Sequence, residues 1–148
     1  MNSFLVGSFT IIAVAIAALW WAAAPGPEGH SMVPPDTSEI EPGGAIAQVT
    51  VPATLSEQAQ MGKRAFEAYC AQCHGTNAAG RNGMAPPLVH KIYEPSHHGD
   101  GAFLVAAQQG VRAHHWNFGN MPAVEGITPA EVKTIIAYVR ELQRENGI

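Results

Sequence analysis

The chain has 148 residues, a net charge of −4 and only two cysteines. Two cysteines exclude a framework of several disulfides, so a small fold needs another source of stability beside its apolar core. From residue 54 onward, eight Lys and Arg residues balance eight Asp and Glu residues. This balance argues against nucleic acid as a partner.

The N-terminal segment, residues 1–24, is predicted to be a transmembrane anchor. Residues 4–24 are 21 uncharged positions, which as a helix would be about 31 Å long, close to the hydrocarbon thickness of a bilayer. Trp20 and Trp21 lie near its end, as in an interfacial aromatic belt. A cleaved signal peptide ending at Ala24 is the alternative, but the run is longer than a signal-peptide core and no Lys or Arg precedes it.

Residues 25–53 are predicted to be a flexible acidic linker. The segment contains six prolines, four glycines, four acidic residues and no Lys or Arg. Such a composition buries too little apolar surface to offset the entropy of chain ordering. We expect a tether between the membrane and the folded domain, and a passive spacer is the alternative.

Residues 54–148 are predicted to form one small all-α domain, because no alternating strand pattern of useful length occurs there. The stretch Thr54-Leu55-Ser56-Glu57 is a candidate capping box with Thr54 as the N-cap. The first helix is expected to run from there to about Tyr69. Long loops join the predicted helices, which is typical of a small domain that wraps a cofactor.

The stretch Cys70-Ala71-Gln72-Cys73-His74 has the C-x-x-C-H pattern of c-type haem attachment. Two thiols three residues apart can each form a thioether with the same porphyrin, and His74 can then place an imidazole nitrogen on the iron. A redox disulfide does not need the histidine, and a zinc site would need a second pair of ligands at suitable spacing. We therefore expect one covalent haem c, held by Cys70 and Cys73 and ligated by His74.

Two further helices are predicted after this motif. A short one is expected over residues 100–109, closed by Gly110 as a left-handed cap. The last begins at a second capping box, Thr128-Pro129-Ala130-Glu131, with proline at the first helical position. Apolar residues then recur every three or four positions to about Glu145, which predicts an amphipathic helix.

Met121 is the best candidate for the second axial ligand, because it follows a loop and lies shortly before the last helix. A thioether sulfur favours ferrous iron, and a His/Met pair closes the iron to small ligands. Met84 is the weaker alternative, since it lies only ten residues after His74.

Histidines in the loops leave bis-histidine ligation open as an alternative. They are His90, His97, His98, His114 and His115. The two adjacent pairs could also bind copper or zinc at the surface, although loop histidines more often hydrogen-bond to backbone, propionates or water. Arg112 and Trp116, in the same region, are candidate donors to a haem propionate.

From about residue 56 to its C-terminus the chain resembles the class I, monohaem cytochromes c. The C-x-x-C-H motif and Asn120-Met121-Pro122 before the last helix carry the resemblance. It implies a small fold of three to four helices wrapped around one covalent haem, with the first and last helices crossing. It also implies that Gly62 and Phe66 are close-contact positions on the first helix, with Tyr138 as the aromatic partner on the last.

The stretch Ala85-Pro86-Pro87-Leu88 is similar to the Pro-x-Leu segment of this family. The resemblance implies that the Pro86 carbonyl holds the second ring nitrogen of His74 and that Leu88 packs on the haem. Bacterial members receive their haem on the periplasmic side. Together with the predicted anchor at residues 1–24, the resemblance therefore implies a membrane-anchored bacterial form, single-pass in the inner membrane, with its haem domain in the periplasm.

We expect a one-electron carrier and no catalytic residue. The carrier would pass electrons between periplasmic or membrane-bound redox proteins through a haem ligated by His74 and Met121. A fixed cytochrome subunit of a larger redox complex has the same haem chemistry and is the main alternative. A ligand-binding haem enzyme or sensor would need an open distal site, against which Met121 argues.

Overall fold

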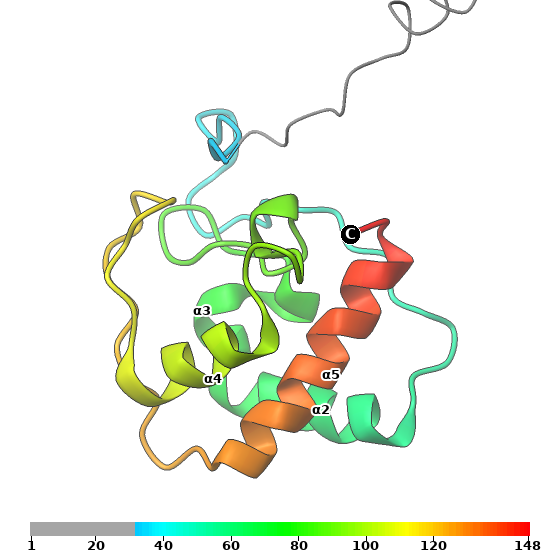
Figure 1. Ribbon diagram of the computed structural model, residues 1–148. Coiled ribbons are helices and arrows are strands. Elements are labelled where there is room, and N and C mark those ends of the chain that lie inside the picture. The colour runs from blue at the N-terminus through cyan, green and yellow to red at the C-terminus, as the bar shows by residue number, and fades with distance from the viewer. Residues whose placement is uncertain (1–31) are drawn as a thin grey trace, which may run out of the picture. The chain divides into compact units, whose positions relative to one another are not determined.

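The computed structural model describes residues 32–148 (Figure 1). The predicted anchor, residues 1–24, and the start of the predicted linker lie outside the described residues. Within residues 32–148 the regular structure is helical, with two isolated backbone bridges and no strand. This confirms the all-α prediction for the domain. In the same range no helix combines the length and the apolar character needed to cross a bilayer.

Four α-helices and two short 3-10 helices make up the described fold. In chain order they are α2 (Glu57–Tyr69), α3 (Ala71–His74), η1 (Thr76–Ala78), η2 (Lys91–Tyr93), α4 (Asp100–Gln109) and α5 (Pro129–Glu145). Helices α2 and α5 pack across each other, and α4 packs against α5 (Figure 1). The loops between α3 and α4 and between α4 and α5 form the side of the domain away from the crossing of α2 and α5 (Figure 1).

The contact between α2 and α5 depends on Gly62. A Cβ atom at this position would lie 1.9 Å from the carbonyl oxygen of Thr134 in α5, so the two backbones touch. One turn further along, the rings of Phe66 and Tyr138 meet with centroids 5.8 Å apart, and both side chains are almost fully buried. The close-contact positions implied by the resemblance are therefore present.

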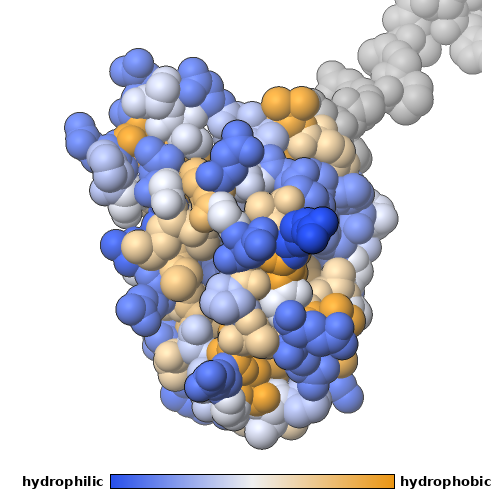
Figure 2. Space-filling view, turned by 90° about the vertical axis from the view of Figure 1, so that its left-hand side faces the viewer, coloured by the Kyte–Doolittle hydropathy of each residue, from blue (hydrophilic) through white to orange (hydrophobic). Residues whose placement is uncertain are grey.

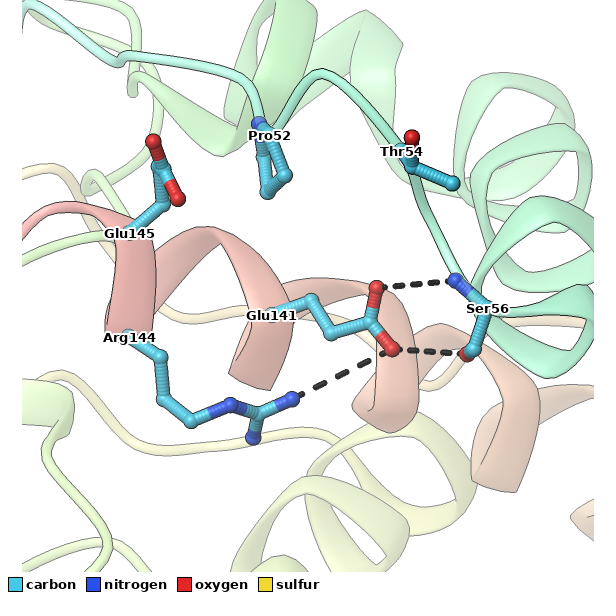
Figure 3. A pocket seen from close by; sticks show the side chains of 6 residues that line it. All are labelled: Pro52, Thr54, Ser56, Glu141, Arg144 and Glu145. Carbon is cyan, nitrogen blue, oxygen red and sulfur yellow. Dashed lines mark hydrogen bonds and ion pairs between the residues drawn. The ribbon is translucent and has the colours of Figure 1, made fainter.

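The start of α2 differs from the prediction. Ser56, not Thr54, is the N-cap, and its Oγ accepts a hydrogen bond from the Ala59 amide at 3.2 Å. The carboxylate of Glu141 in α5 accepts hydrogen bonds from the Ser56 amide at 3.2 Å and from its Oγ at 2.6 Å (Figure 3). This contact with α5 fixes Ser56 as the cap, while Thr54 only lines the shallow pocket beside it.

The other two predicted helices are confirmed. At the start of α5, Thr128 Oγ1 accepts from the Glu131 amide at 3.2 Å and Glu131 Oε2 accepts from the Thr128 amide at 2.8 Å, which is the predicted capping box. Helix α4 ends at Gly110 as expected. The backbone of Gly110 has φ +76° and ψ 178°, a region open essentially to glycine alone, rather than the left-handed helical conformation.

Part of the segment predicted to be a flexible linker, residues 25–53, is hydrogen-bonded to the domain. The Asn82 side-chain amide donates to the Ile40 carbonyl at 2.6 Å. The Asn146 side chain accepts from the Thr50 amide at 2.9 Å and donates to the Thr50 carbonyl at 2.8 Å. The second half of this segment is therefore hydrogen-bonded to the domain, because polar side chains of the domain satisfy backbone groups that composition alone assigns to solvent.

Replacing Gly62 by alanine is expected to lower the free energy of unfolding by about 3 kcal/mol, because the added methyl group meets backbone that cannot turn away. Gly101 is the matched control. It lies in α4, and a Cβ atom added there would have no neighbour within 4 Å, so Gly101→Ala should be neutral or stabilise by up to about 1 kcal/mol. Urea unfolding followed by circular dichroism measures both, and equal effects would contradict the proposed backbone contact.

Candidate functional site

His74, the last residue of α3, is held by the loop that follows it. Its side chain is buried, and its Nδ1 lies 2.9 Å from the carbonyl oxygen of Pro86. A carbonyl oxygen only accepts, so this hydrogen bond requires the proton on Nδ1 and leaves the lone pair on Nε2. The contact implied by the resemblance is therefore present, and it orients the ring as a ligand.

Burial favours the neutral form of the His74 ring. Burial lowers the pKa of His74 below its ordinary value, and the hydrogen bond to Pro86 offsets only part of that fall. A neutral imidazole is the form that binds a metal ion. The site therefore presents a ligand that needs no deprotonation near neutral pH.

The two thiols of the motif differ in their surroundings. Cys70 is half-buried and Cys73 is exposed, and both are free cysteines in the structure. Burial, with a smaller contribution from the neighbouring Cys73, raises the pKa of the Cys70 thiol to about 11. A redox-active dithiol needs a lowered thiol pKa, so this environment argues against that alternative. Among residues 32–148, neither cysteine belongs to a group of three or more candidate metal ligands.

Helix α5 and the loop after His74 support each other. The Tyr138 hydroxyl donates to the Asn77 side-chain oxygen at 3.0 Å, and Asn77 has a positive φ of 54°. The next residue, Ala78, accepts from the Leu88 amide at 2.9 Å. Leu88 is half-buried and packs against the apolar core. These contacts place the segment that carries the Pro86 carbonyl beside His74.

Met121 lies in a defined backbone setting. Its amide and carbonyl exchange hydrogen bonds of 2.9 Å with Val111, just after α4. A Cβ on Gly110 would lie 2.5 Å from the Met121 carbonyl oxygen, so only glycine permits this approach. The side chain of Met121 is half-buried, whereas that of Met84 is 45% exposed. Ligation of the iron by Met121 stays a prediction.

The burial and hydrogen bonding of Trp116 show whether the residues of this site fit a haem. Its side chain is 6% exposed, and its indole nitrogen is a buried donor without a hydrogen-bond partner of good geometry in the described part of the chain. Burial raises the pKa of the nearby Tyr93, and a hydrogen bond with the Trp116 side chain offsets part of that rise. A buried donor without a well-aligned partner is costly, and a haem propionate would supply a better acceptor. The residues present therefore fit the predicted cofactor.

Arg140 and Gln143 were not among the residues that the sequence singles out. The Arg140 guanidinium donates to Asp100 Oδ1 at 2.9 Å, to the Tyr93 carbonyl at 2.8 Å and to the His98 carbonyl at 2.5 Å. Gln143 Nε2 donates to the carbonyls of Leu88 and Tyr93, at 2.8 and 2.9 Å. Together these two side chains hold residues 88–98 against α5. Both are polar residues in an amphipathic helix, where polar side chains are expected to face solvent. Only their burial in the structure therefore reveals that they hold residues 88–98.

Comparison with known proteins supports the interpretation of these residues as a haem site. A family model described as Cytochrome c matches residues 59–143, which is more than half of the chain. The match begins in α2 and ends in α5, and it includes the C-x-x-C-H motif, the Pro86 segment and Met121. No curated protein was found to match the chain.

Arg140→Ala is expected to lower the free energy of unfolding by about 3 kcal/mol, because it leaves buried carbonyl groups and the Asp100 carboxylate without their charged donor. Arg144→Ala is the matched control on the same helix. The Arg144 side chain is 66% exposed and lies 3.9 Å from Glu141, so its loss should cost less than about 0.5 kcal/mol. Urea titration of the haem-loaded variants measures both, and a small effect at Arg140 would refute its supporting role.

Proposed function

The chain belongs to the cytochrome c family, and on that premise we propose that it is a one-electron carrier with His74 and Met121 as axial ligands. As a member of this family it binds haem c covalently. The observation that carries the proposal is the buried His74 ring, whose Nδ1 is fixed on the Pro86 carbonyl at 2.9 Å. A ring held in this way presents Nε2 in one direction only.

The residues of the site have distinct roles in this proposal. Bound there, the haem supplies an iron that alternates between the ferrous and ferric states. Cys70 and Cys73 would hold the porphyrin through thioethers, and Leu88 would pack against it. His74 would supply its Nε2 lone pair and Met121 its thioether sulfur as ligands to the iron.

Electron transfer is favoured over an enzymatic reaction. A carrier needs two filled axial positions, and the chain offers a candidate for each. The half-buried Met121, with its backbone fixed by Val111, is better placed for this than the exposed Met84. The partners are then redox proteins that dock against the domain.

We further propose that residues 1–24 anchor the protein in a bacterial inner membrane, with the haem domain in the periplasm. The uncharged run at residues 4–24 supports the anchor. The site of thioether formation in bacterial cytochromes c supports the periplasmic location. These two proposals stand on the sequence.

A fixed subunit of a larger redox complex is the second candidate function. Asn82 Nδ2 donates to the Thr37 carbonyl at 3.1 Å, so the predicted linker is held to the domain at residue 37 or earlier. The twelve residues before it, 25–36, reach at most about 40 Å, which limits the range of a tethered carrier. Purification of the native protein in mild detergent separates the two functions, because a fixed subunit elutes with its complex and a carrier elutes alone.

Met121→Ala is expected to abolish the weak long-wavelength absorption band that sulfur ligation gives ferric haem. The variant should also bind carbon monoxide in the ferrous state and have a lower reduction potential, because the thioether's preference for ferrous iron is lost. Absorption spectra and a redox titration measure these changes. Met84→Ala is the control and should keep the band. A band that survives in Met121→Ala, with a spectrum that shifts when a loop histidine is replaced, would indicate bis-histidine ligation.

The protein isolated from the membrane fraction is expected to retain residues 1–24, because the uncharged run is long enough to span a bilayer and lacks a basic leader. Intact mass spectrometry should give the mass of the full chain plus one haem. A version without residues 4–24, exported by a cleavable signal, should be released with an unchanged haem spectrum. A mature N-terminus near Pro25, with the cytochrome in the aqueous periplasmic fraction, would contradict retention of the anchor.

A further inference from the structure

Histidines from two distant segments meet in the structure, and we name His97, His98, His114 and His115 the histidine cluster. The first two precede α4, and the other two lie in the loop after it. Their rings are in mutual contact, with His98 centroids 4.6 Å from His97, 5.8 Å from His114 and 5.4 Å from His115.

The ring orientation of two members is fixed by backbone carbonyls. His98 Nδ1 lies 2.6 Å from the Ile92 carbonyl oxygen, and His114 Nδ1 lies 2.9 Å from that of Arg112. Because a carbonyl only accepts, both Nδ1 atoms carry the proton and both Nε2 atoms keep a lone pair. Histidines that bind metal ions are typically oriented by such a hydrogen bond from the second nitrogen.

The distances suit a small ion. His97 Nε2 and His115 Nε2 are joined by a hydrogen bond of 3.3 Å, whose proton a metal ion would displace. Two ligands on a tetrahedral ion with bonds of about 2.0–2.1 Å are also about 3.3 Å apart. One ligand atom from each of His97, His98 and His115 falls within 4.8 Å of the others. The third ligand needs only a small inward movement, and His97 is exposed and free to adjust.

Charge and ligand type narrow the choice of ion. Burial lowers the pKa of His98 and of His115, and repulsion between neighbouring imidazolium groups adds to the fall. The guanidinium of Arg140 acts on His98 in the same direction, although Arg140 is paired with Asp100. Neutral imidazoles suit zinc and copper, whereas magnesium and calcium prefer carboxylates.

We propose that His97, His98 and His115 form a binding site for a divalent transition metal ion, Zn²⁺ or Cu²⁺, separate from the haem. The fourth position is left to water or to the adjacent His114. The ion would join the segment before α4 to the loop that leads to Met121. Figure 2 shows the face of the molecule that this loop crosses in Figure 1, with hydrophilic side chains between separate apolar patches. Solvent therefore reaches this side of the domain.

Calorimetric titration of the haem-loaded full chain, purified without a histidine tag, tests the site with Zn²⁺ alone. The expected result is one ion per chain. The double variant His97→Ala/His115→Ala should bind Zn²⁺ at least about 100-fold more weakly, because two of three ligands are gone. The haem spectrum of the double variant verifies that its domain has folded. If it does not fold, the single variant His97→Gln, at an exposed residue, takes its place.

His90→Asn is the matched control. His90 lies outside the histidine cluster and accepts a hydrogen bond from the Ile92 amide through Nδ1 at 3.2 Å, which an asparagine oxygen can replace. This variant should bind Zn²⁺ as the wild type does. Bound Cu²⁺ should also show hyperfine coupling to imidazole nitrogens in electron paramagnetic resonance, and lose it in the double variant. The proposal would be overturned if the wild type did not bind one Zn²⁺ ion per chain. It would also be overturned if the double variant bound Zn²⁺ as strongly as the wild type.

Discussion

The close approach of α2 and α5 at Gly62 is the constraint on which the rest of the domain depends. Because the Thr134 carbonyl lies where a Cβ would be, the helices can bring Phe66 against Tyr138. The Tyr138 hydroxyl then reaches Asn77 in the turn that follows His74. A contact between two helix backbones thus fixes the turn that follows His74, the candidate iron ligand, through one aromatic side chain.

Helix α5 organises the other half of the site with polar side chains. Arg140 and Gln143 satisfy carbonyl groups of residues 88–98 that would otherwise be buried without donors. This arrangement holds the chain just after Pro86 and also places His97 and His98. A buried guanidinium is unfavourable unless it is fully paired. Here its hydrogen bonds to carbonyl groups and Asp100 supply that pairing, and they connect the haem site with the histidine cluster.

Features that depend on nearby residues could be predicted from the sequence, and features that depend on distant partners could not. The capping box at Thr128 and the end of α4 at Gly110 involve residues within one or two turns, and both are confirmed. Ser56 caps α2 through a local hydrogen bond from the Ala59 amide, and Glu141, 85 residues later, supports it by accepting hydrogen bonds from Ser56. Composition likewise does not reveal that Asn82, in the predicted domain, donates to the Ile40 carbonyl in the predicted linker.

The loop between α4 and α5 carries both His115 and Met121, yet its two ends are supported by different contacts. The Met121 backbone is paired with Val111 beside α4, whereas the histidine cluster is oriented by backbone carbonyls and by its own rings. Trp116 separates them, because its buried ring packs edge-on against His90 and stacks on Phe118. The hydrogen bonds of the Met121 backbone involve none of the cluster's imidazoles, so a substitution of the His97 or His115 side chain leaves the Met121–Val111 hydrogen bonds without a lost partner.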